Sequence, residues 1–159
     1  MKKMSLQYLR MHTNMESVID ELAPNTLGEG DLNGNDDRMP YSLFVEAVEQ
    51  APMAISITDK KANILYVNEA FSKVTGYQST DILGENQSKL SDKTTPRHVY
   101  HDLWHTISSK KIWKGILCNR HKFGHRYLSD LTIAPILNER GTITHFIGMH
   151  RDITQVYES

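Results

Sequence analysis

The sequence predicts an α+β domain in which a five-stranded antiparallel sheet has its helices gathered on one face. After residue 40, strand and helix patterns follow one another in the order β-β-α-α-α-β-β-β, and short turns join neighbouring strands. Hydrophobic residues make up 39% of the 159 residues. They are concentrated after Tyr41, so about 115 residues are available to form one core.

The first 22 residues predict an amphipathic helix. Apolar residues from Met4 to Leu22 recur at alternating steps of four and three, which places one apolar stripe along a helix. An isolated helix of this length is marginal in water. We therefore expect it to pack on the sheet or on a second copy of the chain. Residues 23–40 are rich in Gly, Asn and Asp and predict a flexible linker.

The next part of the chain predicts a helix, a β-hairpin and three further helices. Asn68 is a suitable N-cap, Gly84 a suitable C-cap, and Pro96 suits the first position of a helix because its missing N–H costs nothing there. The expected elements are a helix over 41–50, strands over 54–58 and 63–67, helices over 69–74 and 79–83, and a helix from 96 to about 109.

Three strands complete the sheet, over residues 112–120, 126–137 and 142–152. Side chains alternate between the two faces of a strand, and Lys114 and Arg120 mark the outer face of the first. The inner face then carries three polar residues and two glycines: Asn119, Ser129, His150, Gly115 and Gly148. Such buried polar groups either bond to one another and the backbone, or bind a planar polar ligand for which the glycines leave room.

The outer face of the predicted sheet is strongly apolar. It carries Ile55, Ile57, Ile116, Ile147 and Met149, a larger patch than a monomer usually exposes. The helices over 4–22 and 41–50 are the expected covers, and a homodimer that shares them is the simplest hypothesis.

Composition excludes several classes of function. A net charge of −1 disfavours a nucleic-acid binder, and no apolar run approaches the ~20 residues of a membrane span. Cys118 is the one cysteine, which excludes an internal disulfide and suits a reducing cytoplasm. No nucleophile elbow, phosphate loop or metalloprotease motif is present, so we expect no enzyme.

A metal site is disfavoured although the chain has eight histidines. His98, His101 and His105 share one face of the helix after Pro96, but an apolar stripe occupies the opposite face. The histidine face should therefore lie against water. The same geometry disfavours a haem ligand, since only His150 is placed inward by strand alternation.

Six segments in order resemble a PAS domain. They are APMAISITD (51–59), ILYVNEAF (64–71), TGY (75–77), LGEN (83–86), WKGILCNR (113–120) and FIGMHRDIT (146–154). The resemblance covers residues 41–155, and it implies the PAS fold. Residues 156–159 would begin a connector to an output domain.

Within that family the chain is most similar to flavin-binding redox sensors of the kind found in the nitrogen-fixation regulator NifL. The resemblance implies noncovalently bound FAD, with FMN less favoured, whose oxidation state reports oxygen or redox status to a downstream regulatory or kinase-type protein. It implies that Asn119 bonds the pyrimidine edge of the flavin and that Ser56, Gln87 and His150 line its redox-active edge. The other implied cofactor contacts are Asn86, Arg97, Trp104, Trp113 and Ser129.

Position 87 departs from both flavin-binding branches. Light-oxygen-voltage (LOV) domains have a cysteine there, and sensors of the NifL type tend to have an acid, whereas this chain has Gln87. A photoadduct with cysteine is therefore excluded at this position. Reduction of the flavin protonates N5, so Gln87, Ser56 or a water must reorganise, since a mismatched buried pair costs about 1–3 kcal/mol. This energy would be enough to shift the sheet, or a dimer interface, between two conformational states.

Two other functions stay open at this point. The domain could bind another small molecule, or none, and serve as a dimerisation and protein-interaction module. It could also be a fragment of a flavoenzyme, although no acid, base or nucleotide loop on a substrate side is visible in the sequence.

Overall fold

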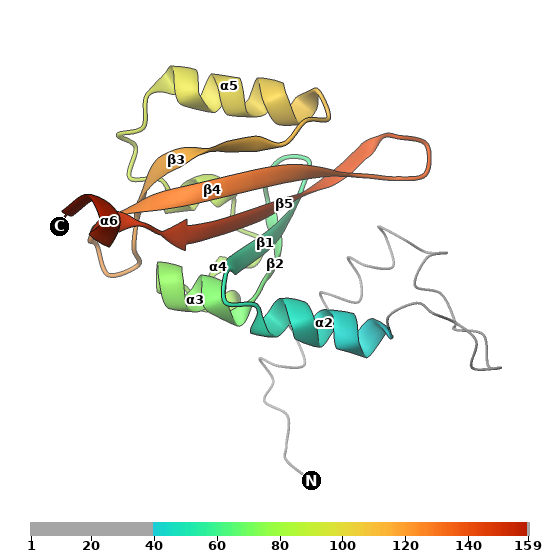
Figure 1. Cartoon of the computed structure of the whole chain (residues 1–159), viewed down its shortest axis with the longest axis horizontal. Coiled ribbons are helices and arrows are strands. Elements are labelled where there is room, and N and C mark those ends of the chain that lie inside the picture. Colours follow the sequence, from blue (N-terminus) through green and yellow to red (C-terminus); the bar gives the residue numbers. More distant parts are fainter. Residues whose placement is uncertain (1–39, 159) are drawn as a thin grey trace, which may run out of the picture.

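The computed structural model describes residues 40–158, which form an antiparallel sheet with strand order β2-β1-β5-β4-β3 (Figure 1). The strands are β1 (Ala54–Asp59), β2 (Ile64–Val67), β3 (Trp113–Arg120), β4 (Arg126–Leu137) and β5 (Ile143–Asp152). The helices are α2 (Tyr41–Gln50), α3 (Glu69–Thr75), α4 (Ser79–Ile82), the 3-10 helix η1 (Gln87–Leu90), α5 (Arg97–Ser108) and α6 (Thr154–Glu158). The predicted α+β class and the five-stranded sheet are confirmed. The helix expected over 4–22 and the linker up to residue 39 lie outside the described residues.

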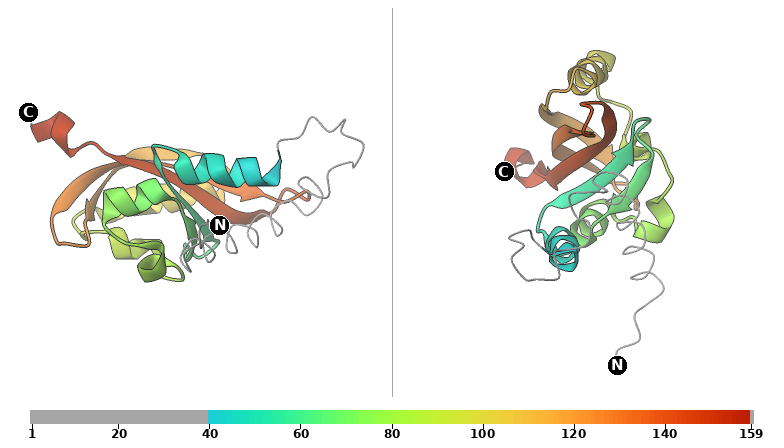
Figure 2. Two further views of the ribbon diagram at one scale, coloured as in Figure 1. Left: turned by 90° about the horizontal axis from the view of Figure 1, so that it is seen from below. Right: turned by 90° about the vertical axis from the view of Figure 1, so that its right-hand side faces the viewer.

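Most predicted boundaries agree with the structure within one or two residues, and two elements were not predicted. Pro96 is the residue before α5 rather than its first residue, with an extended ψ of 147°. The short helices η1 and α6 lack any apolar periodicity long enough to predict them. Figure 2 shows α6 projecting from the end of β5, away from the body of the sheet.

Asn68 joins three elements at the start of the domain and is buried. Its Oδ1 accepts hydrogen bonds from the backbone N–H of Phe71, as the predicted cap of α3, and from that of Ile55 on β1 at 2.8 Å. Its Nδ2 donates to the backbone carbonyls of Val48 and Met53. Because the amide is fully used, Asn68 fixes the ends of α2 and α3 relative to β1.

The core lies on both faces of the sheet. On the inner face, α3, α4 and η1 pack against β1 and β2, and α5 packs against β3, β4 and β5. On the outer face, Val45 and Val48 of α2 pack on Ile57 and Ile147, so the predicted cover over 41–50 is confirmed. Ile116, farther along the outer face, stays 46% exposed.

None of the described helices combines the length and the apolar character that crossing a bilayer requires.

Candidate functional site

A cavity of about 140 Å³ lies between the inner face of the sheet and the helices η1 and α5. Its walls are largely apolar, and its volume is close to the ~150 Å³ cavity that accommodates benzene in an engineered core. The exposed residues Ser88 and Trp104 also line it, which places the opening between η1 and α5. A planar ligand longer than one ring can therefore extend through this opening.

Three adjacent strands place polar side chains on the cavity wall. Asn119 of β3, Ser129 of β4 and His150 of β5 all point inward and are buried, as strand alternation predicts. β1 adds Ser56, which pairs in register with Gly148 of β5. A Cβ at Gly148 would lie 3.1 Å from Ser56 Oγ, so this glycine keeps the floor of the cavity open.

Several of these polar groups have no partner within the described residues. The unpaired buried atoms of the cavity are Gln87 Oε1, Ser129 Oγ and His150 Nε2. Leaving a buried polar atom without a hydrogen bond costs about 1–3 kcal/mol, so native proteins rarely do so without a reason. Three such atoms around one cavity indicate a ligand with polar groups along its edge.

Asn119 is only partly used by the protein. Its Nδ2 donates one long hydrogen bond to the Tyr127 hydroxyl at 3.4 Å, whereas a side-chain amide can make up to four. Burial raises the pKa of Tyr127 to about 12, although the bond from Asn119 acts in the opposite direction. Tyr127 is therefore a neutral phenol, and Asn119 keeps donor and acceptor capacity for a ligand.

His150 is a neutral imidazole in this environment. Burial lowers its pKa to about 4, against a smaller opposing effect from the Asp152 carboxylate. Its ring stands edge-on to Phe71 with the centroids 5.6 Å apart. A neutral imidazole carries one donor and one acceptor nitrogen, so His150 can complement either kind of polar atom on a ligand.

The β1–β2 turn positions the segment that carries Gln87. The backbone N–H of Gln87 donates to the Ala62 carbonyl at 2.8 Å. Asn86 Nδ2 donates to the Lys61 carbonyl, and Asn86 Oδ1 accepts from Ser88 N and so begins η1. The Gln87 side chain therefore enters the cavity from a backbone that is fixed by the hairpin.

Seven of the nine predicted site residues line this one cavity. They are Ser56, Asn86, Gln87, Trp104, Asn119, Ser129 and His150. Arg97 is exposed at the start of α5 and is not among the lining residues. Trp113 is buried between β3 and α5 and does not line the cavity either.

The structure corrects the role expected for Gly115. A Cβ at this position would lie 2.4 Å from two carbons of the Trp113 ring. Gly115 therefore makes room for the indole of its own strand, and only Gly148 makes room at the cavity.

Among the polar cavity residues that the sequence did not predict are Thr58 of β1, Ser91 of the loop before α5 and Tyr100 of α5. Ser91 Oγ lies 2.9 Å from the Tyr100 hydroxyl. For Tyr100 a signal existed, because it belongs to the apolar stripe of the helix. Ser91 lies in a loop without periodicity, so nothing in the sequence indicated its position.

The histidines of α5 behave as expected. His98, His101 and His105 are exposed. Among residues 40–158 no group of three or more His, Cys, Asp or Glu side chains is arranged to hold a metal ion.

The residues of the cavity fit an uncharged, planar, heteroaromatic ring. Apolar walls contact its faces, and donors and acceptors on three strands and η1 meet its edges. No Lys, Arg, Asp or Glu lines the cavity, so phosphate groups attached to such a ring would have to lie outside it. The isoalloxazine ring that the sequence resemblance implies is a ring of this kind.

Known proteins resemble this chain in sequence and in structure. A nitrogen fixation regulatory protein of Klebsiella oxytoca is 43% identical over 115 residues, which are 72% of this chain and 23% of that protein. Blue-light-activated histidine kinase 1 of Erythrobacter litoralis is 32% identical over 120 residues, covering 74% and 33% of the two chains. An RNA-binding light-oxygen-voltage receptor has a similar structure, with a TM-score of 0.70 at 24% identity over 79% of this chain and 38% of that one.

These relatives are regulatory and sensor proteins, and the chain spans about a quarter of the length of the nitrogen fixation regulatory protein. The family model described as "PAS domain" matches residues 52–155, which is well over half of the chain. This span includes all five strands and every residue that lines the cavity. The chain belongs to the PAS domain family.

Proposed function

We propose that this PAS domain is a redox sensor that binds FAD noncovalently, with the flavin ring in the cavity between the sheet, η1 and α5. The observation that carries this proposal is the set of unpaired buried atoms on Gln87, Ser129 and His150 around an uncharged cavity. The 43% identity to a nitrogen fixation regulatory protein supports a role in regulation rather than catalysis.

The bound flavin would supply reversible electron transfer that is coupled to protonation at N5. When N5 changes from a hydrogen-bond acceptor to a donor, Gln87 and Ser56 can still bond to it, because an amide and a hydroxyl can each donate or accept. His150 can do the same through its neutral ring. Asn119 would hold the pyrimidine edge and fix the ring in the cavity.

A rearrangement of these side chains would be transmitted through the sheet to a partner protein. β5 carries His150 and continues into α6, where Asp152 Oδ1 accepts from the Thr154 backbone N–H, and Thr154 Oγ1 accepts from the backbone N–H of Leu128 on β4. We place the output at this end of β5 and a homodimer contact on the outer sheet face with the segment 4–22. The partner would be a regulatory or kinase-type protein in the cytoplasm, in the control of nitrogen fixation.

Reconstitution with FAD tests the proposal. Purified protein is mixed with FAD, freed of excess cofactor and examined for flavin absorption, and the released cofactor is identified. We expect bound FAD and a weaker affinity for Ser129→Ala, which removes a cavity hydroxyl. Thr132→Val removes a hydroxyl from the opposite face of the same strand and should bind FAD like the wild type.

The outcomes separate the candidate functions. A protein that stays colourless but dimerises through residues 4–22 would contradict the flavin sensor and favour an interaction module. Turnover of a substrate by the FAD-bound protein would instead favour a flavoenzyme fragment.

A further inference from the structure

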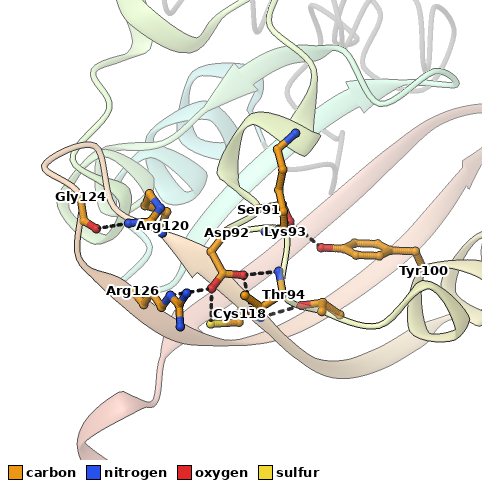
Figure 3. A network of polar contacts seen from close by, with 10 residues as sticks. Ser91, Asp92, Lys93, Thr94, Tyr100, Cys118, Arg120, Gly124 and Arg126 are labelled. Carbon is orange, nitrogen blue, oxygen red and sulfur yellow. Dashed lines mark hydrogen bonds and ion pairs between the residues drawn. The ribbon is translucent and has the colours of Figure 1, made fainter.

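A buried carboxylate on the loop before α5 connects that loop to the outer face of β3. The side chain of Asp92 is fully buried. Its Oδ1 accepts from the backbone N–H and the hydroxyl of Thr94, and its Oδ2 accepts from Cys118 Sγ and from Arg126 Nε, both at 3.1 Å (Figure 3). We call Asp92, Thr94, Cys118 and Arg126 the Asp92 network.

The Asp92 network passes around the edge of the sheet. Cys118 and Arg126 point to the outer face, whereas their neighbours along β3 and β4, Asn119 and Tyr127, point inward. Ser91, directly before Asp92, lines the cavity and forms a β-bridge with Asn119. Asp92 and Cys118, which bond to each other, are thus the chain neighbours of Ser91 and Asn119 on the cavity wall.

Backbone bonds make this connection tight. Asp92 N donates to the Cys118 carbonyl at 3.3 Å, and Cys118 N donates to Thr95 Oγ1 at 3.1 Å. Burial raises the pKa of the Asp92 carboxyl, but the bonds from Thr94 and Cys118 and the charge of Arg126 outweigh burial and hold it below its usual value. Asp92 is therefore a carboxylate that accepts from every donor around it.

We propose that Asp92 is a positioning residue for the ligand cavity: from the outer side of β3 it fixes Ser91 and Asn119 where they meet the bound ring. This inference rests on the proposed flavin site. Asp92 does not touch the cavity itself, so its effect on a ligand passes through its two neighbours.

Asp92→Asn is an isosteric test of this role. An amide has two N–H donors, and in either orientation it points them at groups that are themselves donors: Thr94 on one side, or Cys118 and Arg126 on the other. We expect about tenfold weaker FAD binding. Asp130→Asn is the matched control, because Asp130 pairs with Arg151 at 3.2 Å on the outer face and does not line the cavity.

Cys118 offers a second test that leaves Asp92 in place. Cys118→Ser keeps a hydroxyl donor to the carboxylate and should bind FAD like the wild type. Cys118→Ala removes the donor and should weaken binding about threefold. This pair decides the question even where Asp92→Asn does not fold.

Two readouts distinguish positioning from general destabilisation. In ligand-free protein, amide hydrogen exchange at Asp92 and Cys118 should be about tenfold faster in Asp92→Asn than in Asp130→Asn. In FAD-bound protein, the infrared carbonyl band of the flavin should move to higher frequency, because Asn119 no longer holds the pyrimidine edge.

The experiment separates the two proposals. Faster exchange in Asp92→Asn with unchanged FAD affinity and an unchanged carbonyl band would overturn the positioning role and leave the flavin site intact. A wild-type protein that binds no FAD would overturn the proposed function. The role of Asp92 would then be judged on the ligand-free exchange rates alone, with equal rates in the two variants against it.

Discussion

The indole N–H of Trp113 donates a hydrogen bond to Asp102 Oδ2 at 3.1 Å and joins the first residue of β3 to the middle of α5. Trp113 packs in the same cluster as Leu103 and Ile107 of α5, which line the cavity. The position of this cavity wall therefore depends on a tryptophan that does not line the cavity.

Gly115→Ala should disturb this contact. The new Cβ would lie 2.4 Å from the rigid Trp113 ring, which has to move and lose its bond to Asp102. We expect a loss of about 1–3 kcal/mol in the free energy of unfolding, measured by urea denaturation, and a shifted tryptophan emission. Trp113→Phe removes the N–H together with one of the two fused rings, so it should also lower stability by reducing the packing against α5. Wild-type stability of Gly115→Ala would contradict the packing described here.

His150 should make stability depend on pH. In the unfolded chain a histidine binds a proton below about pH 6.5, whereas folded His150 does so only below about pH 4. Since the unfolded state binds more protons between these values, stability is lost as the pH falls through this range, by up to about 3 kcal/mol. Denaturation curves at several pH values should show this loss reduced in His150→Gln. His98→Gln, at an exposed position of α5, should keep it.

Tyr66→Phe should loosen α2 on the outer face of the sheet. The Tyr66 hydroxyl donates to the Glu49 carboxylate at 2.5 Å, both residues are buried, and burial together with Glu49 raises the pKa of Tyr66. Losing this donor should cost about 1–3 kcal/mol in thermal or urea unfolding. The double variant Glu49→Gln with Tyr66→Phe should lose less than the single variant, because the buried charge is gone. An equal loss in both would exclude the carboxylate as the cause.

Gln87 should affect the redox response more than the binding of FAD. Gln87→Leu makes no hydrogen bond to N5 in either redox state, and we expect the two states to lose unequal hydrogen-bond energies that differ by about 1–3 kcal/mol. For a two-electron couple this is a shift of roughly 20–60 mV in midpoint potential, measurable by spectroelectrochemistry. Thr132→Val, on the outer face of β4 and away from the cavity, is the control. An unchanged potential in Gln87→Leu would exclude this residue from the response.

The sequence predicted those parts of the site that depend on alternation along strands. Asn119, Ser129 and His150 were placed inward because residues two apart on a strand share a face, and the structure agrees. Alternation predicts the face of the sheet to which a side chain points, but not which residues it contacts there. Trp113 was therefore assigned to the correct face, while its indole lies over Gly115 and against α5 rather than in the cavity.

The loop before α5 could not be predicted in the same way. Ser91 and Asp92 follow no period, and their positions depend on contacts with residues far along the chain, namely Asn119 and Cys118 of β3. Lys93, between the network residues Asp92 and Thr94, has a φ of +69°, which composition does not reveal. Long-range contacts of this kind appear only once β3 is placed beside the loop.

The side-chain amide of Asn119 gives the most direct test of the flavin site. In ¹⁵N-labelled protein its NH₂ resonances can be assigned by their absence in Asn119→Asp and followed during titration with FAD. We predict that they shift as FAD binds, while those of Asn138, in the β4–β5 turn, do not. Saturating FAD that leaves the Asn119 resonances unmoved would contradict the account.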